Sequence, residues 1–135
     1  MSSSTFISHV ATIEIPVINL EQSVNFYMDV LGVELEFKGE KNAMLTFKKE
    51  GVPTFFLVET ETTQGTSFKN TNTGVVHSVI DFYTPRLQDF YQWLKEKNIE
   101  VGPLNIHPKN GYGGFGFKDP NGNLLSATNV LHEGQ

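Results

Sequence analysis

The chain has 135 residues, 39% of them hydrophobic and 19% charged, which suits one compact domain and excludes two large independent ones. Its formal net charge of −5 disfavours binding to nucleic acid and to anionic membrane surfaces, and mildly favours neutral or cationic ligands. The chain contains no cysteine, which excludes disulfides, thiolate nucleophiles and cysteine-based zinc sites.

The start of the chain and its hydropathy predict no membrane-associated segment. The first ten residues, MSSSTFISHV, lack the basic start and the long apolar run of a secretory signal peptide. No stretch approaches the ~18 consecutive apolar residues that a membrane-spanning helix needs. We therefore expect a soluble cytoplasmic protein.

The first half of the chain is expected to open with a strand followed by a helix. Residues Ile7 to Val17 are rich in β-branched types and predict the strand. The helix follows Asn19, a good N-terminal cap, and ends at Gly32, where a left-handed residue is favoured. Its apolar stripe consists of Leu20, Val24, Tyr27 and Leu31.

Three short β-rich runs follow this helix and complete a βαβββ order. They are Val33 to Phe37, Ala43 to Lys48 and Thr54 to Glu59, separated by turn-forming residues. We assign residues 7–61 to this first module. The polar stretch from Thr60 to Thr73 has no periodicity and is predicted to be a linker.

The second half is expected to repeat the same order over residues 74–130. Val75 to Phe82 predicts a strand, and Thr84 is the expected cap of a helix with Pro85 at its first position. The apolar stripe of this helix consists of Leu87, Phe90, Tyr91 and Leu94. The remaining strand candidates are Glu100-Val101, Gly114 to Phe117 and Leu124 to Asn129.

These elements predict an α+β fold made of two pseudo-repeated βαβββ modules. Aligning Phe26-Tyr27 with Phe90-Tyr91 places the first helix on the second and supports an internal repeat. We expect residues 1–135 to form a single domain in which the two modules build a cupped mixed sheet around a pocket. Two unrelated α+β halves that share an element order remain the alternative.

Two motifs resemble a known family. Residues 20–32, LEQSVNFYMDVLG, fit a helix pattern L-x-x-S-x-x-F-Y-x-x-V-L-G, and residues 117–123, FKDPNGN, are similar to a turn pattern F-x-D-P-D-G-N. Both patterns are typical of the vicinal oxygen chelate superfamily, which contains glyoxalases, bleomycin resistance proteins and extradiol dioxygenases. The resemblance covers nearly the whole chain and implies the fold predicted above.

The resemblance also implies a divalent metal with four ligands, two from each module. The matching positions in this sequence are Thr12, Phe56, His77 and Ser126. A stable transition-metal site needs about three ligands of the His, Glu, Asp or Gln type, and only His77 is of that type. We therefore predict that the usual four-ligand centre is missing, with His77 as its single candidate ligand, and predict no cofactor.

Other polar residues are expected to share a face with these positions. Because side chains alternate along a strand, Glu14 lies on the same face as Thr12, and Asp81 on the same face as His77. These groups are interpreted as polar residues of a pocket wall. The alternative is a relocated metal site, and Glu14 and His77 are also the candidates for general acid or base catalysis.

Residues 111–116, GYGGFG, match G-x-G-x-x-G letter for letter. A dinucleotide site needs a helix after this motif, whereas a strand and a turn follow here, so we predict no such site. We interpret the glycines as a flexible loop beside the pocket, with Tyr112 and Phe115 able to cap a ligand. A glycine-rich bend without a ligand role is the alternative. Phe56 is expected to make the pocket more apolar.

The combined prediction is a metal-independent small-molecule binding protein that resembles the bleomycin-resistance branch of the superfamily. Its ligand would be hydrophobic or cationic, and the resemblance implies a homodimer. The alternative is a metal-dependent lyase, isomerase or dioxygenase with an atypical metal site. The predicted ligand-binding residues are Thr12, Glu14, Phe56, His77, Asp81, Tyr112, Phe115 and Ser126.

Overall fold

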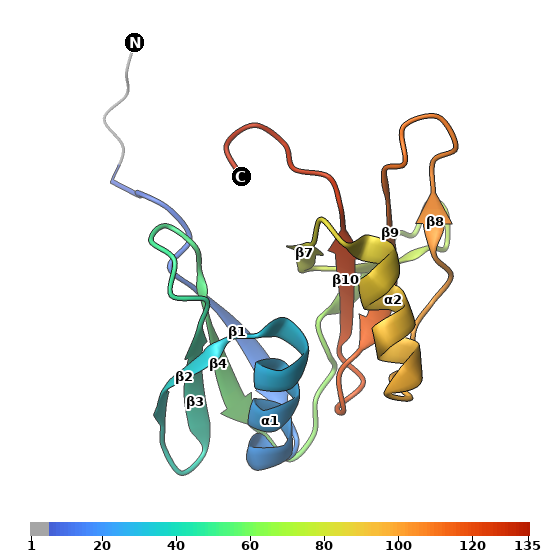
Figure 1. The fold of residues 1–135 in the computed structure, drawn as a ribbon. Helices are drawn as coiled ribbons and strands as arrows, with labels where there is room; N and C mark the ends of the chain where they lie inside the picture. Colours follow the sequence, from blue (N-terminus) through green and yellow to red (C-terminus); the bar gives the residue numbers. More distant parts are fainter. Residues whose placement is uncertain (1–5) are drawn as a thin grey trace. The chain divides into compact units, whose positions relative to one another are not determined.

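The structure is a computed structural model that describes residues 6–135. These residues form two compact units, one ending at Thr63 and the other beginning at Gln64. Each unit contains a four-stranded sheet and one helix (Figure 1). The two units are described separately below.

The first unit has the predicted βαβββ order. Its elements are β1 (Thr12–Val17), α1 (Leu20–Leu31), β2 (Glu34–Lys38), β3 (Asn42–Thr46) and β4 (Thr54–Glu59). The strand order in the sheet is β1-β4-β3-β2, with β1 parallel to β4 and the other neighbours antiparallel. The parallel pair requires a crossover connection, and α1 lies in it.

The core of the first unit lies between α1 and one face of this sheet. Residues on that face alternate with residues on the open face, as the pleat of a strand requires. The helix contributes Tyr27, whose side chain is fully buried, together with Val24 and Leu20. The sheet contributes Ile15, Val17, Ala43, Leu45, Phe55 and Leu57.

Both ends of α1 are capped as the sequence predicts. The Asn19 side-chain oxygen accepts a hydrogen bond from the Gln22 amide at 2.9 Å. Gly32 adopts a left-handed φ of 75°, and its amide donates to the Met28 carbonyl at 3.1 Å. The Leu20 amide donates to Glu59 Oε2 at 2.9 Å, which ties the start of the helix to the end of β4.

The second unit repeats the arrangement. Its elements are β5 (Ser67–Lys69), β6 (Val76–Ser78), β7 (Asp81–Tyr83), α2 (Leu87–Glu96), β8 (Asn105–Ile106), β9 (Gly113–Lys118) and β10 (Leu124–Thr128). The four-stranded sheet has the order β7-β10-β9-β8, with β7 parallel to β10. This is the strand order of the first unit, so the α+β class and the two βαβββ modules are confirmed.

The segment before α2 differs from its prediction. The expected strand from Val75 to Phe82 divides into β6 and β7, and β6 pairs with β5 in a separate two-stranded sheet. The strand β5 lies inside the stretch predicted to be a linker. The hydroxyls of Thr66 and Ser78 both donate to the Leu124 carbonyl at 3.2 Å, which attaches this hairpin to β10.

Two further boundaries in the second unit were predicted wrongly. The helix α2 begins at Leu87 rather than at Pro85, and Thr84 caps no helix; its hydroxyl accepts a hydrogen bond from the Arg86 amide at 3.1 Å. Val101 forms a single bridge to Phe117, whereas the regular strand in this region is β8. Short elements of this kind are held by their neighbours rather than by local propensity.

The turn between β9 and β10 is stabilised by its own polar side chains. Asp119 is buried, and its Oδ1 accepts hydrogen bonds from the amides of Asn121 at 2.8 Å and Asn123 at 2.9 Å. Its Oδ2 accepts from Asn123 Nδ2 at 2.8 Å. Gly122 has a φ of 84°, a conformation that favours glycine. The F-K-D-P-N-G-N motif therefore has a structural role here.

Within the described part of the chain, no helix is long and apolar enough to cross a membrane.

The different N-termini of the two helices give a matched pair of variants. Asn19→Ala removes a side-chain cap and is expected to lower the free energy of unfolding by about 1 kcal/mol. Arg86→Ala removes an N-cap residue whose side chain makes no capping hydrogen bond, so its effect should be clearly smaller. Urea denaturation of both variants checks this; equal losses would contradict a larger contribution from the Asn19 cap.

The contact between Glu59 and α1 predicts a pH dependence of stability. The hydrogen bond from the Leu20 amide, and then the one from Lys41, hold the pKa of Glu59 below its ordinary value of 4.5. A lowered folded-state pKa gives stability that is present above pH 4.5 and is lost as the pH falls through the folded pKa.

The expected result is that wild type is more stable than Glu59→Gln above about pH 5, and that the difference shrinks towards pH 3. Thermal melts at a series of pH values measure it. The control is Glu50→Gln, which removes an exposed carboxylate that forms no hydrogen bond with another described residue. A constant difference between wild type and Glu59→Gln at all pH values would contradict the assignment.

Candidate functional site

A depression in the second unit lies on the face of its sheet that α2 does not cover. It has a volume of about 790 Å³ and is open to solvent. Its lining residues come from β7, from the ends of β9 and β10, and from the hairpin that joins β8 to β9. They are Asp81, Leu104, Asn105, Ile106, His107, Tyr112, Gly113, Gly114, Phe115, Ser126, Ala127 and Thr128.

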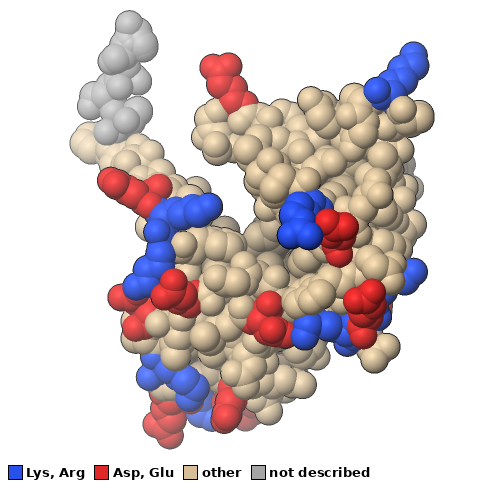
Figure 2. All heavy atoms as spheres, viewed as in Figure 1, with Lys and Arg blue, Asp and Glu red and all other residues tan. Residues whose placement is uncertain are grey.

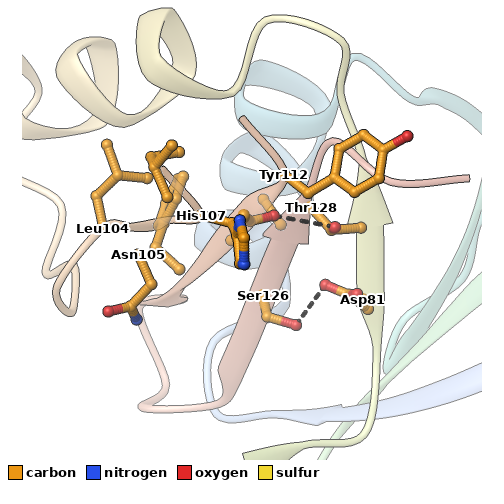
Figure 3. Close-up of a pocket in the computed structure, with 12 residues that line it drawn as sticks. Asp81, Leu104, Asn105, His107, Tyr112, Ser126 and Thr128 are labelled. Atoms are coloured by element: carbon orange, nitrogen blue, oxygen red, sulfur yellow. Dashed lines mark hydrogen bonds between the residues drawn. The ribbon is translucent and has the colours of Figure 1, made fainter. Parts of the chain in front are cut away.

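The polar centre of this pocket is a pair of side chains from two parallel strands. Ser126 on β10 is the register partner of Asp81 on β7, so both side chains lie on the same face. Figure 3 shows them pointing toward one another, and the Ser126 hydroxyl donates to Asp81 Oδ1 at 2.8 Å. Asp81 is exposed, so its carboxylate keeps acceptor capacity for a ligand.

A hydrogen-bonded hairpin presents His107 and Tyr112 at the pocket. The His107 amide donates to the Tyr112 carbonyl at 2.7 Å. The Lys109 amide donates to His107 Nδ1 at 3.2 Å, so in the neutral ring the proton is on Nε2. The histidine can therefore offer one N–H donor to a ligand.

Asn129, directly after β10, holds the base of this hairpin. Its side-chain oxygen accepts from the Gly113 amide at 2.9 Å, and its Nδ2 donates to the Gly111 carbonyl at 3.0 Å. Both contacts flank Tyr112. The backbone on both sides of Tyr112 is therefore held by a side chain that does not itself line the pocket.

The glycines of this region are required by the close approach of strands. Gly113, Gly114 and Gly116 belong to β9, so the expectation of a flexible loop was wrong for them. A Cβ on Gly114 would lie 2.7 Å from the Ala127 carbonyl oxygen. Gly116 is the register partner of Ser126 and leaves bare backbone beside the Ser126 hydroxyl.

The two aromatic candidates from the glycine run lie in different environments. Tyr112 is 55% exposed and stands at the pocket, whereas the Phe115 side chain is only 5% exposed. The Phe115 ring packs against Tyr91 at 4.9 Å and against Phe90 at 5.8 Å, on the side of α2. Phe115 therefore borders the pocket as part of β9, while its ring belongs to the core.

His77 lies outside the pocket lining. It is on β6, and its ring stacks on that of Phe68, with centroids 5.2 Å apart and an interplanar angle of 15°. Asp81 lies on β7, in a different sheet. The expected common face of His77 and Asp81 assumed one continuous strand, which the structure divides.

The remaining candidates, Thr12, Glu14 and Phe56, lie on the open face of the sheet in the first unit. Thr12 Oγ1 is 3.2 Å from Thr54 Oγ1. Glu14 is exposed and is the register partner of Phe56, whose ring lies 6.2 Å from that of Phe37. This face is therefore part apolar and carries the carboxylate of Glu14.

The four positions that the family resemblance assigns to a metal do not fit one. Phe56 has no donor atom, the Thr12 hydroxyl contacts Thr54, and the Ser126 hydroxyl donates to Asp81. His77 is the only imidazole or carboxylate among the four. Across residues 6–135, no group of three His, Cys, Asp or Glu side chains is arranged to hold a metal ion.

The charged residues do not gather into a patch of one sign on the face seen in Figure 2. Lys and Arg side chains alternate there with Asp and Glu side chains. This pattern agrees with the net charge of −5 in giving no basic surface on that face for nucleic acid.

The sequence predicted Tyr112 from the β8–β9 hairpin as a site residue, but it gave no role to His107 or to Asn129, which holds the hairpin. One signal could have located the hairpin: Asn110-Gly111 is a strong turn dipeptide. No local pattern marks Asn129 as the residue that holds it.

A family model described as the Glyoxalase/Bleomycin resistance protein/Dioxygenase superfamily matches residues 7–126. No match was found among curated proteins.

Several solved structures share this fold. An antibiotic-binding protein from a Streptomyces species has a TM-score of 0.69 at 21% identity, covering 93% of this chain and 98% of that one. A lactoylglutathione lyase from Agrobacterium tumefaciens has a TM-score of 0.64 at 19% identity, covering 92% and 95%. A fosfomycin resistance protein from Listeria monocytogenes has a TM-score of 0.67 at 17% identity, covering 98% of both chains. At these identities the likeness establishes the fold alone.

The different positions of Phe115 and Tyr112 can be tested by truncation. Phe115→Ala removes a buried ring and should lower the free energy of unfolding by about 3–5 kcal/mol. Tyr112→Ala removes an exposed ring and should change it by about 0.5 kcal/mol or less. Chemical denaturation measures both, and similar losses for the two variants would contradict the assignment of Phe115 to the core.

Proposed function

The chain belongs to the Glyoxalase/Bleomycin resistance protein/Dioxygenase superfamily, and on this basis we propose that it is a small-molecule binding protein that works without the superfamily's usual four-ligand metal centre. The ligand is an organic molecule that is part apolar and carries a cationic or hydrogen-bond-donating group. Its main contacts are with the pocket of the second unit.

The hydrogen bond between Ser126 and Asp81 is the observation that carries this proposal. The residue at the fourth ligand position is a serine whose hydroxyl proton is used by a carboxylate 2.8 Å away. A serine hydroxyl is a poor ligand for a divalent transition metal, whereas a hydroxyl and carboxylate pair is well suited to bind an ammonium or amide N–H group. The chemistry at this position thus favours hydrogen bonding over coordination.

The lining of the pocket supports the choice of ligand. Its volume of about 790 Å³ lies within the range of ~300–1,000 Å³ that is typical of small-molecule sites. Leu104, Ile106 and Tyr112 give it apolar surface. Asp81 is its one carboxylate, and neither Lys nor Arg is among the lining residues. A positively charged group near Asp81 is therefore favoured over an anionic one.

The open face of the first unit, taken by itself, also presents apolar surface from Phe56 and Phe37 and the carboxylate of Glu14. Among the similar structures, the Streptomyces protein is described as antibiotic-binding, which is a function of the proposed kind. A homodimer is part of the proposal by resemblance to the family, and a cytoplasmic location is proposed beside it.

Metal content is the first measurement that tests the proposal. Untagged protein purified without chelators is expected to contain far less than one metal ion per chain by mass spectrometry. Nickel, zinc, manganese and iron(II) should each leave the melting temperature unchanged, because the positions matched to the family's ligands offer one imidazole and no carboxylate. Near-stoichiometric metal that is lost in His77→Ala would overturn the metal-independent reading and favour a lyase, isomerase or dioxygenase.

Ligand preference is then measured with a panel of small aromatic amines, matched neutral isosteres and matched carboxylic acids. The amines should raise the melting temperature most. Asp81→Asn should weaken their binding by about tenfold or more, since it removes a charge-assisted hydrogen bond. Glu133→Gln, which makes the same change of net charge at an exposed tail residue, serves as the control. Equal losses in the two variants would contradict a direct role for Asp81.

A further inference from the structure

A second depression lies at the start of α2 and shares no lining residue with the pocket described above. It has a volume of about 330 Å³ and is lined by Thr84, Arg86, Asp89, Phe90 and Trp93. This volume is at the lower end of the range for small-molecule sites, so it suits a ligand of few heavy atoms. This depression takes no part in the function proposed above.

Two aromatic rings form the apolar wall of this depression. The Phe90 and Trp93 rings are stacked, with centroids 6.2 Å apart and an interplanar angle of 23°. Phe90 is also held edge-on against Phe117, 5.6 Å away in the core. The Lys97 ammonium lies over the Trp93 ring, 4.9 Å from its centroid. Both wall residues are half-buried, so they keep surface beside these contacts that an apolar side chain can cover.

An ion pair forms the polar side. The guanidinium of Arg86 donates from Nε and contacts from Nη2 the same oxygen of Asp89, Oδ2, each at 3.1 Å. The other carboxylate oxygen, Oδ1, makes no hydrogen bond within the described residues, and the guanidinium has five N–H donors in all. The two side chains are 77% and 70% exposed, so the pair is weak and can rearrange at little cost.

From these features we propose that the depression binds a small zwitterion with an apolar side chain, which is the chemistry of an apolar α-amino acid. The ligand carboxylate is received by Arg86 and the ligand ammonium by Asp89. The apolar side chain lies against Phe90 and Trp93. Nothing in this arrangement uses Asp81, Ser126 or any other residue of the larger pocket.

The paired charges select a zwitterion over either singly charged molecule. A simple carboxylate gains from Arg86 but meets Asp89, three residues away on the same helix. A simple amine gains from Asp89 but meets Arg86. Only a ligand with both charges extends the ion pair instead of competing with half of it.

Trp93 makes the proposal directly measurable. It is the single tryptophan of the chain, so its indole N–H gives one nuclear magnetic resonance signal, from this depression alone. L-Norleucine, hexanoic acid and pentylamine are the probes, since the last two keep an alkyl chain and one charge each. L-Norleucine is expected to shift the indole signal saturably, and each singly charged probe should bind about tenfold more weakly or worse.

Variants then identify the groups that hold the ligand. Arg86→Gln and Asp89→Asn should each weaken L-norleucine binding by about tenfold. Lys118→Gln, which breaks a comparable exposed ion pair with Glu100, is the matched control and should leave binding unchanged. Circular dichroism checks that each variant keeps its helix content.

Three results would overturn the proposal: no saturable shift with L-norleucine, equal binding of the three probes, or binding that survives both Arg86→Gln and Asp89→Asn. These outcomes are separable from the tests of the larger pocket, because Asp81→Asn is expected to leave the Trp93 signal and its response to L-norleucine unchanged.

Discussion

The parallel pairing of β1 with β4 and of β7 with β10, the first and last strands of each four-stranded sheet in chain order, is the constraint on which the rest of the structure depends. Parallel neighbours cannot be joined by a tight turn, so the chain passes through a helix and two further strands before it returns. In the first unit this pairing sets Glu14 beside Phe56, and in the second it sets Asp81 beside Ser126. The polar and apolar groups of the open faces are thus brought together from distant parts of the sequence by one repeated connection.

The two units use the same strand order for different surfaces. The first unit presents Thr12, Glu14 and Phe56 on its open face. The second presents Asp81 and Ser126, and β10, which carries Ser126, pairs with the glycine-containing strand β9. Hydrogen bonds occupy the hydroxyls at positions where the family resemblance implies metal ligands. A fold is compatible with many chemistries because the side chains on its open faces can change without changing its core. Here the open faces carry hydroxyl and carboxylate groups that form hydrogen bonds.

One aromatic cluster supports both depressions of the second unit. Phe115 and Phe117 on β9 pack against Phe90 on α2, so the strand that borders the larger pocket and the helix that borders the smaller depression share a core. Interiors are close-packed, and a side chain in such a cluster has little freedom to move. The cluster therefore holds the backbone of β9 on one side and the Phe90 and Trp93 wall on the other. Each depression therefore borders on buried aromatic side chains, while the charged groups Asp81, Arg86 and Asp89 remain exposed.

The sequence by itself determined the features that depend on neighbouring residues. The caps of α1, the bounds of β4 and the turn of Asp119 follow from side chains within a few positions of one another, as do the βαβββ order and the family resemblance. Tertiary structure decided the rest. The division of residues 75–82 into β6 and β7 depends on pairing with two different partners, and the burial of Phe115 depends on which face of β9 meets α2. The hydrogen bond from Ser126 to Asp81 and the one from the Gly113 amide to Asn129 join residues far apart in the chain. Such contacts arise only when strands pair, because a local pattern specifies alternation along a strand but not the strand that lies beside it.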